Sequence, residues 1–199
     1  MAGKREIVRR ELTRNLLDAA AKRISMHGLD ALRARDVTND AGCGLGTIYK
    51  CFADLDDLII HVNSVTLSRL KLALTEASRD RTDPVDVLKA LAFTYVEFAQ
   101  RHSQLWRALF EHRLPEGQQV PEWYQLENTA LLGFITQPVS ALEPGLTDQQ
   151  LASRSRTLFA AIHGVVSISL EGRFVGLEDS VLKDEIDELV ERMAVPRAG

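Results

Sequence analysis

Residues 32–58, LRARDVTNDAGCGLGTIYKCFADLDDL, decide the fold. The stretch predicts a short helix over about Ala34–Ala41, a tight turn at Gly42-Cys43-Gly44, and a second short helix over about Leu45–Cys51. Two short helices joined by a glycine-containing turn are typical of a helix-turn-helix unit. We expect Gly42 to take a positive φ at the turn. Apolar side chains should fix the angle between the helices, and these are Val37, Ala41, Cys43, Ile48 and Phe52.

Polar side chains of the second short helix are expected to point outward. Thr47, Tyr49 and Lys50 would offer hydroxyl groups and an ammonium group to phosphate oxygens and base edges in a DNA groove. For Tyr49 the alternative is that its ring covers the helix junction. Leu45 would be exposed as well, either against a thymine methyl group or without a role.

The rest of the sequence also predicts helices. Apolar residues recur at helical spacing, Asp83-Pro84 and Thr147-x-x-Gln150 mark helix starts, and Pro138 should kink or shorten its helix. Val165–Leu170 also fits the period of a strand. The predicted fold class is all-α with about nine helices, with a head over residues 1–53 and a helical body over 54–199. The further helices are expected at about 6–27, 54–79, 84–101, 103–111, from 121 toward 138, 147–172 and 178–194.

The composition is that of a globular protein, with 45% hydrophobic and 26% charged residues among 199, which excludes a disordered or fibrous chain. No window approaches the roughly 18 apolar residues of a membrane span. The charged stretch 1–14 lacks an apolar signal core, so the expected location is the cytoplasm. Cys43 and Cys51 are too few for a disulfide framework, and we expect small core residues rather than a redox or metal pair.

Charge is unevenly distributed along the chain. Residues 1–52 carry ten basic and six acidic residues, while the remainder carries 14 basic and 22 acidic residues. A basic head on an acidic body suggests that only the head meets a polyanion, although so short a segment can be basic by chance. The basic stretch Lys4–Arg14 is either a flexible phosphate-binding arm or only a solvated face.

Several positions of the head resemble the DNA-binding domain of the TetR family of transcriptional regulators. The resemblance covers roughly residues 10–60 and rests on the order and spacing of Asp36-Val37, Ala41-Gly42, Gly46-Thr47-Ile48-Tyr49, Phe52 and Leu58. A weaker likeness, over residues 158–173 with Ile162-His163-Gly164 at its centre, is to one branch of TetR-like ligand-binding domains. The first resemblance implies that the recognition helix contacts DNA and that the preceding helix reaches phosphate. The predicted DNA-contacting residues are then Arg33, Arg35, Leu45, Thr47, Tyr49 and Lys50.

Two positions depart from the family pattern. Arg33 stands where a Ser or Thr usually caps the helix, so that cap is lost or replaced. Leu55 stands where a Lys usually follows the recognition helix, which removes one expected phosphate contact.

Aromatic residues concentrate in the middle helices of the body. Helical bundles bind small molecules between their helices through apolar walls and a few polar groups. Aromatic residues at helical spacing are often plain core, and the polar candidates His112 and His163 could likewise be satisfied core histidines. We expect an apolar effector to meet Phe93, Phe98, Trp106, Phe110, Trp123, Phe134 and His163.

The last two predicted helices are expected to form a homodimer surface, the alternative being packing within one subunit. The final helix repeats apolar residues at spacings of four, three and four, which suits a partner helix, and Gly164 would permit close helix approach. The predicted dimer contacts are Ile162, Val166, Leu182, Ile186, Leu189 and Met193.

The sequence thus predicts a ligand-responsive transcriptional repressor. It would bind a palindromic operator in double-stranded DNA as a homodimer and be released by a small apolar effector, with no cofactor, metal or membrane involved. One alternative is a helical interaction protein with weakened DNA binding, and another is a helical-bundle enzyme. An enzyme is disfavoured, with no catalytic residues predicted, because Glu-x-x-His, HExxH, phosphate-loop and GxSxG motifs are missing from the sequence.

Overall fold

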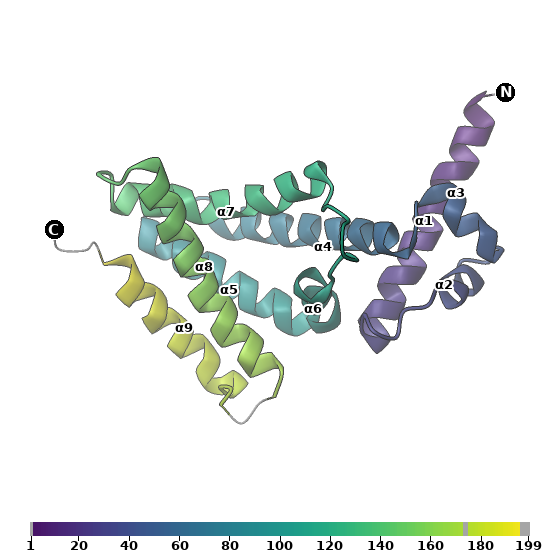
Figure 1. The fold of residues 1–199 in the computed structure, drawn as a ribbon. Helices are drawn as coiled ribbons and strands as arrows, with labels where there is room; N and C mark the ends of the chain where they lie inside the picture. The colour runs from purple at the N-terminus through teal and green to yellow at the C-terminus, as the bar shows by residue number, and fades with distance from the viewer. Residues whose placement is uncertain (1, 173–174, 196–199) are drawn as a thin grey trace. The chain divides into compact units, whose positions relative to one another are not determined.

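The computed structural model of the chain describes residues 2–172 and 175–195. Over these ranges the chain forms nine α-helices and one 3₁₀ turn and no strand, which confirms the all-α prediction (Figure 1). None of the helices in these ranges combines the length and hydrophobicity needed to span a bilayer. The likeness over residues 158–173 ends at a residue outside the described ranges.

The chain divides into two compact units, each with its own core. The first unit contains Met1–Leu67 and His102–Tyr124, and the second contains Ser68–Arg101 and Gln125–Gly199. The long helix α4 (Leu55–Ser78) belongs to both. The compact units therefore do not follow the predicted division at residues 53 and 54.

The first unit is built on the long helix α1 (Ala2–His27), with α2 (Ala34–Asp40), the 3₁₀ turn η1 (Leu45–Thr47) and α3 (Ile48–Cys51) to one side of it (Figure 1). The short helix α6 (Ser103–Glu111) also packs against α1. Apolar side chains from all of these helices meet in one core that excludes water. Its most buried members are Leu16, Ala20, Ile24, Leu32, Val37, Ile48, Phe52, Leu58, Val62, Leu105 and Ala108.

The turn between α2 and α3 has the geometry that the sequence predicts. Gly42 has a φ of +68°, in the left-handed region where a Cβ would be strained. The next residue, Cys43, donates its backbone N–H to the carbonyl of Thr38 at 2.9 Å. The buried Thr38 hydroxyl in turn donates to the carbonyls of Ala34 and Arg35. The turn is thus satisfied without any contact from outside the head.

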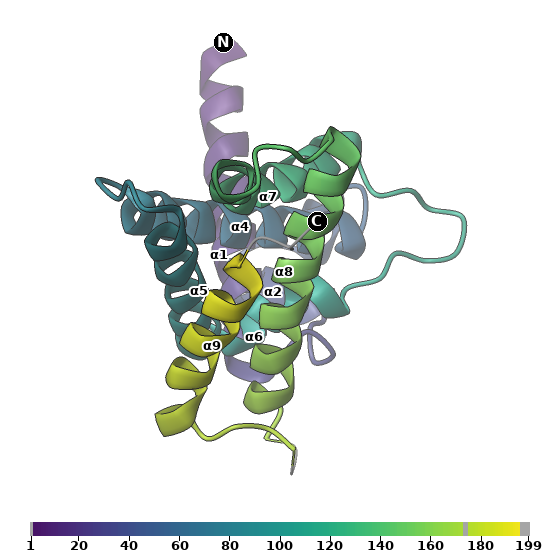
Figure 2. The ribbon, with the colours of Figure 1, turned by 90° about the vertical axis from the view of Figure 1, so that its left-hand side faces the viewer.

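The second unit contains α5 (Pro84–Arg101), α8 (Asp148–Leu170), α9 (Asp179–Ala194) and most of α7 (Glu122–Leu142). Helix α9 lies against both α5 and α8 (Figure 2). Apolar side chains of these three helices share the core. They include Leu88, Leu91, Val96, Ala99, Leu158, Ile162, Val166, Leu182, Ile186 and Val190.

Local capping signals set several helix starts as predicted. The Asp83 carboxylate accepts hydrogen bonds from the backbone N–H groups of Val85 and Asp86 at 2.9 and 3.0 Å. Thr147 and Gln150 form the reciprocal capping box at the start of α8. Pro138 does not end its helix, because α7 continues to Leu142. The Val165–Leu170 segment is helical, and not a strand, within α8.

Candidate DNA-binding surface and effector region

The outer face of η1 and α3 carries large side chains that are open to solvent. Tyr49 is 59% exposed and Leu45 46% exposed, and Lys50 is exposed beside them while Thr47 is half-buried. Ile48, on the opposite face, is only 1% exposed. The Tyr49 ring therefore does not cover the helix junction, and four of the predicted contact residues share one short exposed segment.

Arg33 and Arg35 flank the start of α2, and both are exposed. Arg33 occupies the N-cap position without a side-chain cap, so the predicted loss of the Ser or Thr cap is confirmed. Its guanidinium Nη1 instead donates to the carbonyls of Asp30 and Leu32 at 2.7 and 2.9 Å. A guanidinium has five N–H donors, so further donors remain for a phosphate.

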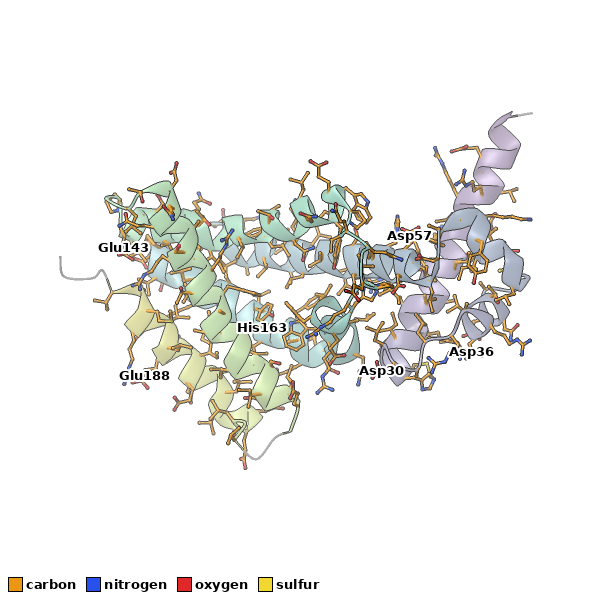
Figure 3. All side chains as sticks on the ribbon, in the orientation of Figure 1. Asp30, Asp36, Asp57, Glu143, His163 and Glu188 are labelled. Carbon is orange, nitrogen blue, oxygen red and sulfur yellow. The ribbon has the colours of Figure 1, made fainter. Side chains whose placement is uncertain are left out.

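Arg23 of α1 pairs with two aspartates of α2. The Arg23 guanidinium donates two hydrogen bonds to the Asp40 carboxylate, at 2.7 and 2.9 Å, and lies 3.5 Å from Asp36, the residue labelled on α2 in Figure 3. The hydrogen bond from Arg23 holds the pKa of Asp40 below its usual value. These ion pairs hold α2 against α1. The sequence does not predict the pair of Arg23 and Asp40, because residues 17 positions apart share no helical period.

The start of α4 is capped by two aspartates next to the head. Asp54 accepts a hydrogen bond from the Asp57 backbone N–H, and Asp57 (labelled in Figure 3) accepts one from the Ala53 backbone N–H, both at 2.8 Å. Leu55, where the family pattern has a Lys, packs against the core of the head. Its side chain has a structural role in this chain in place of a phosphate contact.

Two contacts of the first unit join α6 and the residue that follows it, His112, to the first half of α4. The His112 imidazole Nε2 lies 2.9 Å from the Asp56 carboxylate, and the Asn63 side-chain amide donates to the carbonyl of Ala108 at 3.1 Å. The sequence makes His112 a polar candidate for an effector site, but its buried side chain is paired with Asp56. No local pattern predicts either contact, because the partners lie 45 or more positions apart.

The seven predicted effector residues are divided between the units. Trp106, Phe110 and Trp123 belong to the first, and the second holds Phe93, Phe98, Phe134 and His163. In the first unit the rings of Trp106 and Phe110 lie 5.3 Å apart. Trp106 is 2% exposed, whereas Phe110 is 43% exposed, so only the second ring is readily accessible.

A polar pair lies within the second unit. The Tyr95 hydroxyl is 2.8 Å from His163 Nδ1, and the Phe159 ring stacks on the imidazole with 5.5 Å between ring centroids. Burial lowers the pKa of His163 below its usual value, which favours a neutral imidazole. Figure 3 labels His163 on α8.

The residues predicted to form the dimer contact lie mostly inside the subunit. Ile162 is 7% exposed, and Val166, Leu182 and Ile186 have no exposed surface at all. Because these four side chains pack in the core shared by α5, α8 and α9, they have almost no surface to offer a second subunit. The alternative of packing within one subunit therefore describes these four, and only Leu189 and Met193 remain half-buried.

The two cysteines are both half-buried against the core of the head and form no disulfide. Burial raises the pKa of the Cys43 thiol, which disfavours the reactive thiolate. In the part of the chain that the structure describes, His, Cys, Asp and Glu side chains nowhere gather in a group of three that could hold a metal ion.

An exposed segment on a buried helix-turn-helix core, followed by a helical body, is the architecture of helix-turn-helix transcriptional regulators. Residues 88–195 match the model of the tetracyclin repressor-like C-terminal domain. This match covers more than half of the chain, which therefore belongs to the TetR family. The family consists of transcriptional regulators, not enzymes, and its members bind DNA and small-molecule ligands and are dimeric.

Solved structures share the fold over nearly the whole chain. A protein of unknown function from Rhodococcus sp. RHA1 is 22% identical with a TM-score of 0.75, covering 92% of this chain and 95% of its own. A TetR transcriptional regulator from the same organism is 17% identical with a TM-score of 0.64, covering 95% and 98%. RolR, solved in complex with its ligand resorcinol, is 19% identical with a TM-score of 0.63, covering 92% and 95%. The comparison with curated proteins gave no match.

Proposed function

We propose that this protein is a homodimeric repressor that binds a palindromic operator and leaves it when a small apolar effector binds. The observation that carries the proposal is the exposure of Tyr49 and Leu45 on a segment whose opposite face is buried. An aromatic hydroxyl, an apolar side chain and the Lys50 ammonium group on one short segment suit base edges, thymine methyl groups and phosphates of a major groove.

A homodimer would place two such segments on a two-fold symmetric site, with half-sites about one helical turn or a multiple apart. We assign the dimer surface to the exposed faces of α8 and α9. At Gly164 an added Cβ would meet no atom of the described residues within 4 Å, apart from its chain neighbours and the adjacent backbone of its own helix, so we propose that a second subunit approaches here. Ile168 and Val181 are 40% and 42% exposed and would supply apolar contact area.

This surface predicts different outcomes for two isoleucines on neighbouring helices. Ile168→Asp puts a charge on an exposed position of α8 and should give folded monomers in sedimentation velocity. Ile186→Asp, which the sequence pattern alone would choose as the interface variant, puts the charge into the subunit core instead. A dimeric Ile168→Asp protein would move the interface elsewhere.

Within this mainly apolar class, the effector is proposed to be a small aromatic molecule that also carries a hydroxyl group. In the first unit the partly exposed side chains of Phe110 and Trp123 are available to contact its ring. In the first unit the Asn63 Oδ1 is buried and accepts no hydrogen bond from the described residues, an arrangement that costs free energy unless a donor reaches it. The structure of RolR holds resorcinol, an aromatic diol, which supports the same ligand class.

Release of DNA would follow from a shift between two conformations of the dimer, since an effector can change DNA affinity only by binding one of them better. Helix α4 is the proposed link. It begins directly after the head and continues into the second unit. Two hydrogen bonds join α4 to α6 and to the residue after it, from Asp56 to His112 and from Asn63 to Ala108. Through them a displacement of α6 would move α4 and, with it, the head.

The experiment that tests the proposal is selection of binding sites from a pool of random double-stranded DNA, with Tyr49→Ala as the control protein. Enrichment of a palindrome by the wild type and its loss with the control would support a dimeric DNA-binding regulator. Screening small aromatic alcohols for release of the selected DNA would then identify the effector class. If the wild type enriches no sequence even at low salt, the protein is not a DNA-binding repressor, and a helical interaction protein becomes the better explanation.

A further inference from the structure

The N-terminal turns of α1 extend beyond the other helices of the first unit (Figures 1 and 2). From Glu6 onward, Leu16 is the first residue of α1 that is fully buried. From Glu6 to Glu11 every side chain is exposed, including the apolar Ile7 and Val8 at 65% and 57%. The stretch interpreted as either a flexible phosphate-binding arm or a solvated face is thus helical, and its outer turns have no packing partner within the described residues.

Three arginines gather on this projecting helix. Arg9, Arg10 and Arg14 line one shallow, open groove together with Glu6, Thr13 and Leu17. One carboxylate reaches them, because Arg10 lies 3.3 Å from Glu6 with both side chains well exposed. Among the described residues no carboxylate pairs with Arg9 or Arg14. The groove therefore presents a net positive charge to solvent.

A helix end of this kind is unusual on its own. The outer turns continue the packed part of α1 and so need no separate nucleation, but no tertiary packing by the described residues stabilises them. The single exposed ion pair between Arg10 and Glu6 contributes little. A polyanion along the arginine face would supply the missing partner, since charge complementarity is what this groove offers.

We propose that the helical arm over residues 6–14 is a second DNA contact, which lies along the phosphate backbone beside the groove entered by α3. The arm spans about 12 Å, or roughly three to four base-pair steps along the duplex axis. Helix α3 packs against α1 itself, so the arm continues the helix on which the exposed segment of η1 and α3 is mounted. This inference rests on the proposed DNA binding and adds to it a sequence-independent contact that strengthens binding without reading bases.

The test compares two variants that each lose three positive charges. Arg9→Gln, Arg10→Gln and Arg14→Gln are combined in the arm variant, and Arg69→Gln, Lys71→Gln and Arg81→Gln, all exposed on or after α4, form the matched control. The probe is a duplex of about 40 base pairs carrying the palindrome that the wild type selects. Fluorescence anisotropy over a salt series gives the affinity and its salt dependence.

The arm variant should bind at least about tenfold more weakly near 100 mM salt, and the slope of log affinity against log salt should shrink by about one for each arginine in each subunit. The control variant should stay within about twofold of the wild type. Replacing the same three arginines by Lys should restore most of the affinity, because a phosphate contact needs the charge more than the fork geometry.

Three outcomes would overturn the inference, and they are distinguishable. If the arm variant and the control bind alike, the arm does not touch DNA although the regulator does. If the Gln and Lys variants lose affinity equally, the arm acts through its structure and not through its charge. If the wild type itself binds no duplex, the proposed function is wrong, and this inference, which rests on it, is wrong as well.

Discussion

Helices α3 and α9 are both amphipathic and both bury an apolar face, yet they differ in the side chains that they leave exposed. In α3 and the preceding turn, Ile48 is buried in the head while Tyr49 and Leu45 remain exposed. In α9 the apolar stripe of Leu182, Ile186 and Val190 has no exposed surface, and its solvent face carries charged residues such as Glu185 and Glu188.

Polar contacts reinforce the docking of α9 within its own unit. The Lys89 ammonium group of α5 donates to Asp187 at 2.8 Å and also to Glu191, and these two carboxylates raise the pKa of Lys89. Lys183 donates to Glu97 at 2.9 Å in the same way. An apolar seam therefore shows which face of a helix will be covered, but not whether its own subunit or another molecule covers it.

The largest expected effect is on α9. Ile186→Asp should destabilise the protein by about 4 kcal/mol or more, because a carboxylate would be buried without a partner. On the same helix Glu185→Ala should change the free energy of unfolding by only about 0.5 kcal/mol, since Glu185 is exposed on the solvent face of α9. Urea denaturation followed by circular dichroism compares the two. Equal midpoints for Ile186→Asp and the wild type would show that α9 is not docked as described.

In the head, the same comparison of a buried and an exposed side chain can be made on the adjacent residues Ile48 and Tyr49. Ile48→Ala should lower the free energy of unfolding by about 3 kcal/mol, as expected for a large side chain removed from a core. Tyr49→Ala should leave stability nearly unchanged while weakening binding to the selected DNA by about 1–3 kcal/mol, the range for a specific base contact. Thermal unfolding and anisotropy on the same samples separate the two effects. A strong loss of stability in Tyr49→Ala would assign Tyr49 to the core.

Most of the helices and the core of the head could be predicted because their signals are local. Gly42 at the turn, Asp83 before α5 and Thr147 before α8 act within a few residues of the backbone groups that they satisfy. The periodicity of Val37, Ile48 and Phe52 likewise indicated one buried surface, and the structure buries all three.

Contacts between distant residues could not be predicted from the same patterns. Asp56 and His112 are 56 positions apart, and Lys89 and Asp187 are 98 positions apart, so no helical period relates them. For the same reason Leu182 and Ile186 were assigned to a dimer contact. Their spacing defines a seam, but α5, which covers it, lies about half the chain away.

Hydrogen bonds from Arg154 give a further test of whether α9 packs within its own subunit. The guanidinium of Arg154 donates to Glu143 at 3.0 Å and to the Met193 carbonyl at the end of α9, also at 3.0 Å. Arg154→Leu should cost roughly 2–3 kcal/mol, below the usual loss for a fully buried pair because both side chains keep some exposure. Arg156→Leu, exposed on the same helix, is the control. Equal urea midpoints for the two variants would mean that the hydrogen bonds of Arg154 do not hold α9.

The smallest expected effect concerns the polar pair of Tyr95 and His163 in the second unit. The core of the head is apolar by comparison. Burial lowers the pKa of His163, so the folded state binds its proton less well than the unfolded state, whose imidazole titrates near 6.5. This contribution to stability is complete above that pH and is lost as the pH falls below it toward the lowered value. His163→Phe removes the titrating group and should therefore lose less stability than the wild type between pH 7 and about pH 5. Urea midpoints across this range measure the difference, with Tyr95→Phe as a control that removes the hydrogen bond and keeps the imidazole. Parallel pH profiles for the wild type and His163→Phe would show that the imidazole is solvated, and the second unit would then have no buried titratable group at this position.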